Sequence, residues 1–398
     1  MLTDEMLLER TGLLLSQREV LLGSRYAGLQ QLREHDNRLL AGLRLLRRRG
    51  LGRTDTGEIA DSMGDSSRPW LAWLLTPLDA SPRDAWDAKA LHAPEATLSQ
   101  ALWLAAIKLT LDELPLRQLL ASSAIGGGGE FCWQLASYLA VPGLSTPGLT
   151  SPDLTSPGLD IGEGEQVAPA YFWYLASTGQ VAAKDRLLAH AGDAGPVALQ
   201  AKLALYLLGQ GGDEPRLLEQ LLQQGLQDSD YVPLLLCGAP AQSKVAMLNL
   251  LLQTGALPRR VGALGYSGLS KFVPLLRDLA TQTESPEQTE PSGLGEHSDP
   301  GEDSEPDELA EAAADALCLL LGVEEGERLL ETAVEAVPNF GPEPVLAGRT
   351  LEGDALDAIW HGGNQAQRWA AACHAKLRRP ELPLSRPDGL LGGQWHSC

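Results

Sequence analysis

Histidine and cysteine are the residue types here best suited to bind a metal, and neither forms a metal-binding motif. The seven histidines show no HExxH pattern and no His and Cys spacing typical of zinc sites. They are His35, His92, His190, His297, His361, His374 and His396. Cys373 and His374 come closest, but adjacent residues of a helix point about 100 degrees apart and would not face one metal. At His396 and Cys398, near the terminus, metal binding would be adventitious. We therefore predict no metal site and no cofactor.

Two glycine-containing segments resemble catalytic or phosphate-binding motifs but lack an essential part of each. A nucleophile elbow needs glycine two residues before and two after the serine, and Gly268 follows Ser267 directly. We predict a turn between two helices there. The four glycines 126–129 lack the Lys and Ser or Thr of a phosphate loop, and Glu130 would repel an anion. We predict a hinge before a helix. Because no carboxylate pair stands out either, we predict no catalytic residues and no enzyme.

The charge of the chain argues against nucleic acid as a partner. Its 398 residues carry a formal net charge of -21, which repels phosphates and anionic lipid headgroups. A local exception is the basic run Arg44, Arg47, Arg48, Arg49 and Arg53. This run could contact phosphate or an acidic partner, but basic side chains at a helix C-terminus also complement the helix dipole. We favour that structural interpretation.

The cysteines and the apolar segments predict a cytoplasmic protein. The five cysteines are far apart, without CxxC spacing, and are interpreted as reduced, mostly buried thiols: Cys132, Cys237, Cys318, Cys373 and Cys398. The first ten residues do not resemble a secretory signal. The longest uncharged stretch, Phe131 to Pro152, is interrupted by proline and glycine and would not span a bilayer. We predict no membrane partner.

Composition and periodicity favour helices throughout. Aromatic residues make up only 5% of the chain, and leucine and alanine are abundant. From Leu13 to Leu46 leucines recur at spacings of three and four, which predicts an amphipathic helix or a helical hairpin. Trp70, Trp73 and Trp86 lie close together in the sequence. They could form a binding surface, but packing between helices is the commoner use of such residues.

Two low-complexity stretches interrupt the helical pattern. Pro142 to Asp160 repeats ProGlyLeu and SerPro, and Thr281 to Asp307 is rich in Glu, Asp, Ser and Pro. Neither has enough large apolar side chains for a core, so we predict two disordered insertions. The predicted organisation is 1–140 as an N-terminal helical region, 141–168 and 281–307 as insertions, 169–280 as helical repeats, and 308–398 as a C-terminal repeat and tail.

Between the insertions the apolar segments are short and regular. Each is apolar on one side and ends at Gly, Pro or Asp, as in Ala170 to Ser177 and Val197 to Leu208. Helices this short are not stable alone and must pack on their neighbours. The predicted fold class is therefore all-α, a HEAT-like α-solenoid of short antiparallel helix pairs.

Several segments carry a resemblance to a known family. Arg260 to Ala280 is similar to a HEAT-like repeat, with Gly268 at the turn and Pro274 early in the second helix. Leu309 to Val323 resembles the following Ala-rich helix. Gln367 to Pro380, followed by Pro383 and Leu384, is similar to the closing helix and tail of a HEAT-repeat family encoded with bacterial type VI secretion systems, and Arg38 to Leu45 resembles its early helix. Ser385 departs from that pattern, in which an aromatic residue tends to follow ProLeu.

This resemblance implies an accessory protein of the secretion machinery, a noncatalytic scaffold whose partner is a protein component or effector of that system. The partner-binding residues are unknown from the sequence. An effector-binding immunity or loading protein is a second hypothesis. A third is a HEAT-like lyase acting on tetrapyrrole-carrying proteins, against which stands the lack of a convergent polar cluster.

Overall fold

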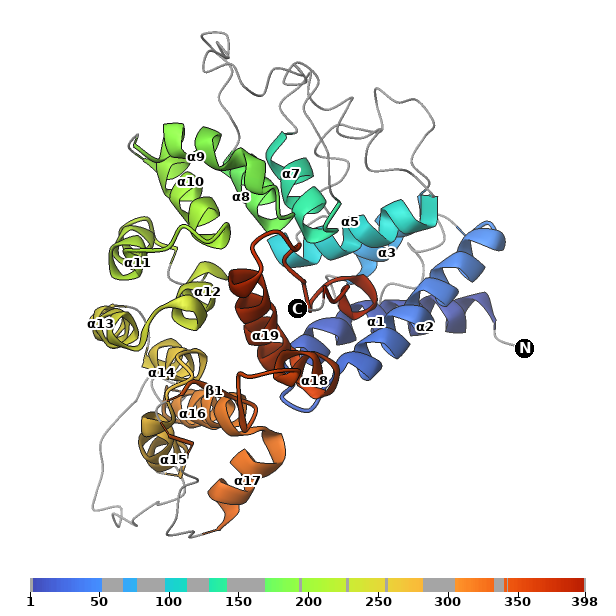
Figure 1. The fold of residues 1–398 in the computed structure, drawn as a ribbon. Coiled ribbons are helices and arrows are strands. Elements are labelled where there is room, and N and C mark those ends of the chain that lie inside the picture. Colours follow the sequence, from blue (N-terminus) through green and yellow to red (C-terminus); the bar gives the residue numbers. More distant parts are fainter. Residues whose placement is uncertain are drawn as a thin grey trace, which may run out of the picture. The chain divides into compact units, whose positions relative to one another are not determined.

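The computed structural model describes residues 3–51, 67–76, 97–112, 129–141, 169–192, 195–226, 229–254, 257–281, 305–332, 340–341 and 343–396. Within these ranges the chain is all-α, with 17 α-helices and one two-stranded hairpin, which confirms the all-α part of the predicted fold class. Figure 1 shows the helices in sequence colours. The chain forms two compact units. Unit 1 comprises Met1–Gln210 and Arg379–His396, and unit 2 comprises Gly211–Arg378 with Ser397–Cys398.

Unit 1 begins with a helical hairpin, one of the two alternatives that the leucine spacing allowed. Helix α1 (Asp4–Gly23) and helix α2 (Leu29–Arg48) pack side by side (Figure 1). The hydroxyl of Thr3 caps α1 by accepting a hydrogen bond from the amide of Met6, 3.3 Å away. The leucines of α2 that recur at spacings of three and four are buried, as expected for the inner face of an amphipathic helix.

The rest of unit 1 continues as helices that each pack on a neighbour. Helix α5 contacts α3 and α7, α7 contacts α8, and α10 contacts both α8 and α9. Helices α5 and α8 are buried on nearly all sides, which explains why their apolar residues show little periodicity. The elements are α3 (Ser67–Leu75), α5 (Leu98–Asp112), α7 (Gly129–Tyr138), α8 (Pro169–Ser177), η3 (Val181–Ala183), α9 (Lys184–Ala191) and α10 (Pro196–Leu207).

Part of the basic run lies in the last turn of α2, at a helix C-terminus as predicted, and Arg47 also contacts the end of α3. Arg47 donates to the carbonyl of Leu74 at the end of α3, with 3.1 Å from its Nε, and pairs with Asp112. Lys108 of α5 donates to the carbonyl of Trp73, 2.5 Å away, and to that of Thr76. Two cations therefore satisfy carbonyl groups at the end of α3, which favours positive charge there. Arg53 lies outside the described residues.

The C-terminal segment belongs to unit 1 and not to the helices that precede it in the sequence. The amide of Leu384 donates to the carbonyl of Ser177 at 2.6 Å. Gly179 lies beside the same segment: its φ is +78°, and an added Cβ would lie 2.1 Å from the carbonyl oxygen of Glu381. Ser385, where the family pattern places an aromatic residue, is buried and accepts a hydrogen bond from the amide of His396 at 3.1 Å. The predicted C-terminal region, 308–398, includes both this segment and helices of unit 2.

Unit 2 contains the remaining helices. Helix α14 packs on α12 and α16, α16 also contacts α15 and α17, and α12 packs on α19. The elements are α11 (Glu214–Gln223), α12 (Tyr231–Gly238), α13 (Ala241–Leu251), α14 (Leu257–Tyr266), η4 (Ser270–Phe272), α15 (Val273–Thr281), α16 (Glu305–Leu321), α17 (Val323–Glu331), α18 (Ala355–Gly362) and α19 (Gln365–Arg378). The strands β1 (Val345–Leu346) and β2 (Arg349–Thr350) form an antiparallel hairpin that the sequence reading missed.

The turn and the early helical proline predicted within Arg260 to Ala280 are present. Gly268 has φ +70° and separates α14 from η4 and α15, in which Pro274 is the second residue. Gly265 allows close approach of α14 to α16, because a Cβ there would lie 3.0 Å from the Cα of Ala316. The turn between two helices that was preferred to a nucleophile elbow is confirmed.

The remaining segment predictions fall partly outside the described residues. Trp70 is buried, as the packing interpretation requires, whereas Trp86 is not described. Residues 142–168 and 282–304, which contain most of the two predicted insertions, also lie outside the described ranges. At the edges of the second stretch, α15 ends at Thr281 and α16 begins at Glu305, so its last three residues belong to a helix.

Candidate functional site

One group of buried cysteine and lysine side chains lies in the core of unit 2. It brings together Cys237 of α12, Cys373 and His374 of α19, and Lys244 of α13. Cys373 and His374, neighbouring residues of α19, both lower the pKa of the Cys237 thiol. The sequence reading treated these cysteines as separate core thiols. Helix α12 packs on α19, and this contact between segments far apart in the sequence creates the cluster.

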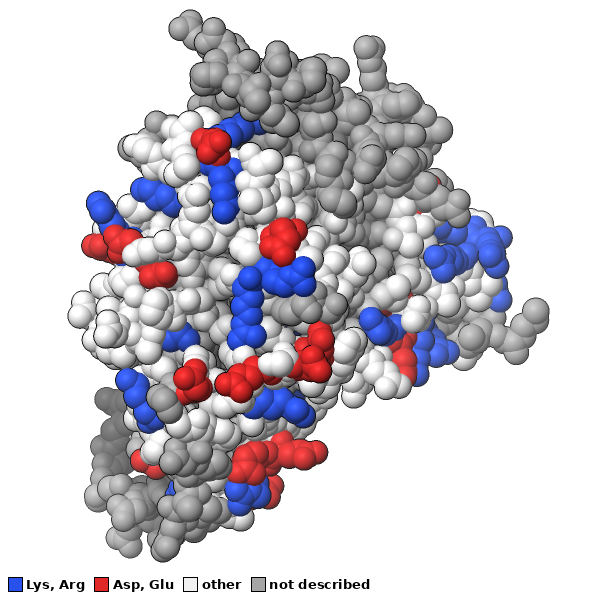
Figure 2. Space-filling model, in the orientation of Figure 1, with Lys and Arg blue, Asp and Glu red and all other residues white. Residues whose placement is uncertain are grey.

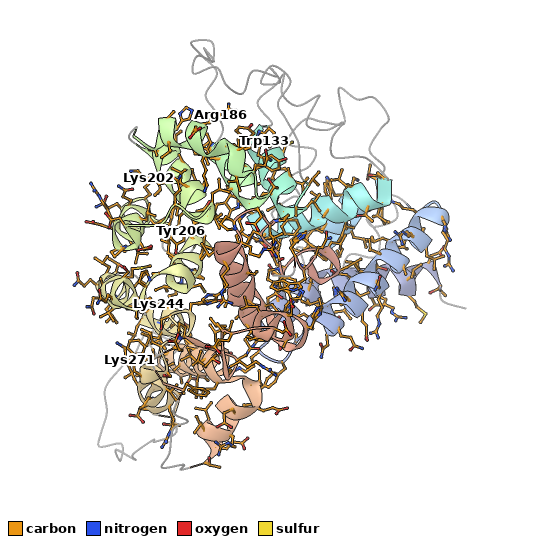
Figure 3. All side chains as sticks on the ribbon, viewed as in Figure 1. Trp133, Arg186, Lys202, Tyr206, Lys244 and Lys271 are labelled. Carbon is orange, nitrogen blue, oxygen red and sulfur yellow. The ribbon has the colours of Figure 1, made fainter. Side chains whose placement is uncertain are left out.

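The cluster is almost entirely closed to solvent. Cys237 and Cys373 are 4% and 0% exposed, and Lys244 is 2% exposed. The sulfur of Cys237 lies 3.8 Å from the carbonyl oxygen of Tyr266. The ammonium of Lys244, labelled in Figure 3, donates to the carbonyl of Ser267 at 2.7 Å. His374 is half-buried, so the cluster reaches the edge of the core through its imidazole.

Electrostatic contacts favour a thiolate at Cys237. The hydrogen bond from Cys373 contributes most, and together with His374 and Lys244 it holds the pKa of Cys237 well below its ordinary value despite burial. Burial lowers the pKa of Lys244, and the nearby Cys237 opposes that shift. A thiolate stabilised by a second thiol is chemically suited to oxidation.

The described residues do not assemble a metal site. No group of three or more His, Cys, Asp or Glu side chains in these ranges is arranged to hold a metal ion. His35 instead lies between the carboxylate of Asp36, 3.2 Å away, and the carbonyl of Leu14, 2.8 Å away. The backbone amide of His396 donates a hydrogen bond to the hydroxyl of Ser385. Cys398 is outside the described ranges.

Ser267 is held by its own turn. Its hydroxyl donates to the carbonyl of Leu264 at 2.6 Å and accepts from the amide of Leu269 at 3.2 Å. Glu130, which follows the four glycines, accepts from the amide of Ala170 at 3.2 Å at the start of α8. Burial, opposed by that hydrogen bond, raises the pKa of Glu130. Both polar side chains therefore serve local structure.

A second buried polar network joins the C-terminal segment to the first two helices of unit 1. Arg18 of α1 pairs with Asp36 of α2 at 3.1 Å and also donates to the carbonyls of Asp388 and Gly389, at 2.8 and 3.0 Å. Asp36 in turn accepts from the amide of Leu391 at 2.7 Å. Burial alone would raise the pKa of Asp36, but the contacts with His35, Arg18 and Leu391 together lower it.

The first two helices also present an apolar stripe to solvent. Met6, Leu13 and Val20 are 51%, 55% and 72% exposed and are spaced seven residues apart, so they lie on one side of α1. The buried residues Leu8 and Leu15 lie on the other side. Exposed apolar side chains aligned along a helix are typical of protein contact surfaces.

The exposed side of α2 is basic, in contrast to the acidic chain as a whole. Arg44 and Arg48 are exposed, while Arg38 pairs with Glu34 at 3.6 Å and Asp36 is buried in its ion pair. Blue side chains gather in Figure 2 where α2 lies in Figure 1. Within the basic run, Arg44 and Arg48 are therefore accessible to an acidic partner.

No family model matches the chain, and no curated protein or solved structure is significantly similar to it. No helix in the described ranges is long and apolar enough to cross a bilayer.

Proposed function

We propose that this chain is a noncatalytic protein that binds other proteins, and that its N-terminal helical hairpin forms the binding surface. The observation that carries the proposal is the solvent-facing row of Met6, Leu13 and Val20 on α1. Burial of such side chains in a complex removes apolar area from water, which is worth about 25 cal/mol per Å². The arginines Arg44 and Arg48 on α2 favour a partner surface that carries acidic residues.

The architecture that accompanies this function is a HEAT-like α-solenoid. Consecutive helices that each pack on a neighbour, the glycine turn at Gly268 and the close approach at Gly265 support it. Solenoids of this kind expose extended surfaces, and many of them bind proteins.

The partner that we propose is a component or effector of a bacterial type VI secretion system, within the bacterial cytoplasm. The support is the resemblance of Arg260 to Ala280, Leu309 to Val323 and Gln367 to Pro380 to a HEAT-repeat family encoded with such systems. Two of these segments coincide with helices α16 and α19, and the third spans α14 to α15.

The test is affinity capture from a lysate of the native host with three forms of the full chain. The first is the wild type. The second carries Leu13→Glu and Val20→Glu, and the third, a matched control, carries Leu188→Glu and Leu252→Glu at comparably exposed leucines. Mass spectrometry should identify the same secretion component with the wild type and with the control, and its loss with the α1 variant.

Two results would contradict different parts of the proposal. Reproducible capture of only unrelated proteins would remove the secretion assignment. Capture that is insensitive to the α1 substitutions, with circular dichroism unchanged, would remove the binding surface but not the function. A tight complex of fixed stoichiometry with one toxin would favour the effector-binding role over the scaffold role.

A further inference from the structure

The C-terminal segment of unit 1 is bound through its backbone groups by side chains of three helices. Arg18 of α1 donates to the carbonyl of Asp388 at 2.8 Å, and the hydroxyl of Tyr138 on α7 donates to the same carbonyl at 2.6 Å. From α2, Asp36 accepts from the amide of Leu391 at 2.7 Å. These side chains therefore recognise the path of the main chain in a segment that is far from them in the sequence.

Apolar side chains of the same segment are buried against unit 1. Leu384 is 1% exposed, and Pro387 is also buried. The short turn η6 (Leu390–Gly392) contacts both α2 and α5. The segment thus combines apolar anchors with main-chain hydrogen bonds, which is the usual way in which proteins bind short peptides.

The segment also folds on itself into a loop. The amide of Gly389 donates to the carbonyl of Arg386 at 3.0 Å, and Nε of Arg386 pairs with the carboxylate of Asp388 at 2.9 Å. At Gly393, φ is +72°, and an added Cβ would collide with the carbonyl oxygen of Arg386. Because these contacts lie within the loop from Arg386 to Gly393, they fix its shape before it binds and reduce the entropy that binding costs.

We propose that Arg18, Asp36 and Tyr138 form a peptide-binding site whose ligand is this C-terminal loop, supplied by the same chain or by a second copy of the chain. Exchange of an identical segment between two copies preserves every contact, and it is therefore a low-cost route to dimers. The chain's own loop competes as if it were present at about millimolar concentration, so a second copy must displace it. The site is separate from the exposed stripe of α1, and this inference does not rest on the function proposed above.

The test measures the binding of a fluorescent peptide of residues 380–396 to the full chain by anisotropy. The wild type should bind the peptide weakly, because its own loop occupies the site. Gly393→Ala in the chain distorts that loop and should tighten peptide binding by about tenfold or more, since the competing segment is removed. Gly192→Ala, where an added Cβ meets nothing within 4 Å, is the matched control and should bind as the wild type does.

Three further measurements test recognition of the loop itself. A peptide that carries Gly393→Ala should bind neither chain. Addition of Tyr138→Phe to the Gly393→Ala chain removes one donor to the loop but keeps the aromatic ring, and it should weaken binding of the unmodified peptide several-fold. Sedimentation velocity of the wild type at about 1 mM should show a dimer that the Gly393→Ala chain does not form.

Each result decides one part of the proposal. Absence of saturable peptide binding to the Gly393→Ala chain, with circular dichroism unchanged, would overturn the peptide site. Equal binding of the two peptides would also overturn it, because the loop would not be what is recognised. If the Gly393→Ala chain does not fold, saturable binding of excess peptide to the wild type decides instead. Peptide binding without a concentration-dependent dimer would remove the second copy as a ligand and leave the site intact.

Discussion

The two glycines of α14 allow the close contact between α14 and α16 to be tested with a single methyl group. At Gly265, an added Cβ would lie 3.0 Å from both the Cα and the carbonyl oxygen of Ala316, and 3.1 Å from Cδ2 of Leu319. At Gly262, one helical turn earlier, an added Cβ would meet no atom within 4 Å. The substitutions Gly262→Ala and Gly265→Ala therefore differ mainly in what the new methyl group touches.

The expected free energies of unfolding follow from two opposing effects. Replacement of glycine by alanine in a helix stabilises it by about 0.5 to 1 kcal/mol at either position. At Gly265 the methyl group also presses on the backbone of α16, which has no rotamer to change, and such overpacking costs about 1 to 3 kcal/mol. Gly265→Ala should thus be less stable than Gly262→Ala by about 1 to 3 kcal/mol.

Differential scanning calorimetry of the full chain measures this difference. For a unit of this size, 1 kcal/mol shifts the melting temperature by about 2 to 4 °C, and the shift should appear in the transition of unit 2. Amide hydrogen exchange should quicken in α16 for Gly265→Ala and not for Gly262→Ala. Equal or higher stability of Gly265→Ala would mean that α14 and α16 are not packed as closely as the structure has them.

Three further predictions concern unit 1 and the acidic stretch. Asp36→Asn leaves Arg18 without its buried counter-charge and should cost about 3 to 5 kcal/mol in urea unfolding. Because the folded pKa of Asp36 is lowered, its ion pair stabilises the wild type above the ordinary carboxyl pKa of about 4 and loses this effect as the pH falls below it. Wild-type stability should therefore fall more steeply in acid than that of Asp36→Asn, and parallel pH profiles would contradict this. Gly179→Ala places a methyl group against the carbonyl of Glu381 and should speed proteolysis of the C-terminal segment, whereas Gly192→Ala, where nothing lies within 4 Å, should not. Replacement of residues 284–302 by a short Gly-Ser join should change the melting temperature of unit 2 little, because closing a loop costs only about 0.6 kcal/mol per doubling of its length; unfolding of the shortened chain would refute this.

The sequence predicted helices more accurately than their assembly. The helical character of α1 and α2 followed from leucine spacing, which left a single helix and a hairpin open, and the turn at Gly268 followed from glycine and proline chemistry. The C-terminal segment was grouped with the preceding helices in the predicted range 308–398 because Gln367 to Pro380, Pro383 and Leu384 resemble the closing helix and tail of one family. Its attachment to unit 1 rests on Arg18, Asp36 and backbone groups near Gly389, which are far apart in the sequence. In the sequence, Arg18 lies on the largely apolar face of the segment that forms α1. An arginine at such a position indicates a buried polar partner.

The thiol cluster shows why motif searches miss sites made by tertiary packing. Cys373 and His374 were predicted not to bind one metal ion together because adjacent helical residues point in different directions. That argument holds for one small metal ion, which needs ligands at about 2.0 to 2.3 Å. It does not extend to the electrostatics of a side chain on a facing helix such as Cys237, because both groups lower the pKa of its thiol. The spacing of two residues within one helix therefore does not exclude a shared electrostatic effect on a facing helix, and α12 faces α19 here because the two helices pack together.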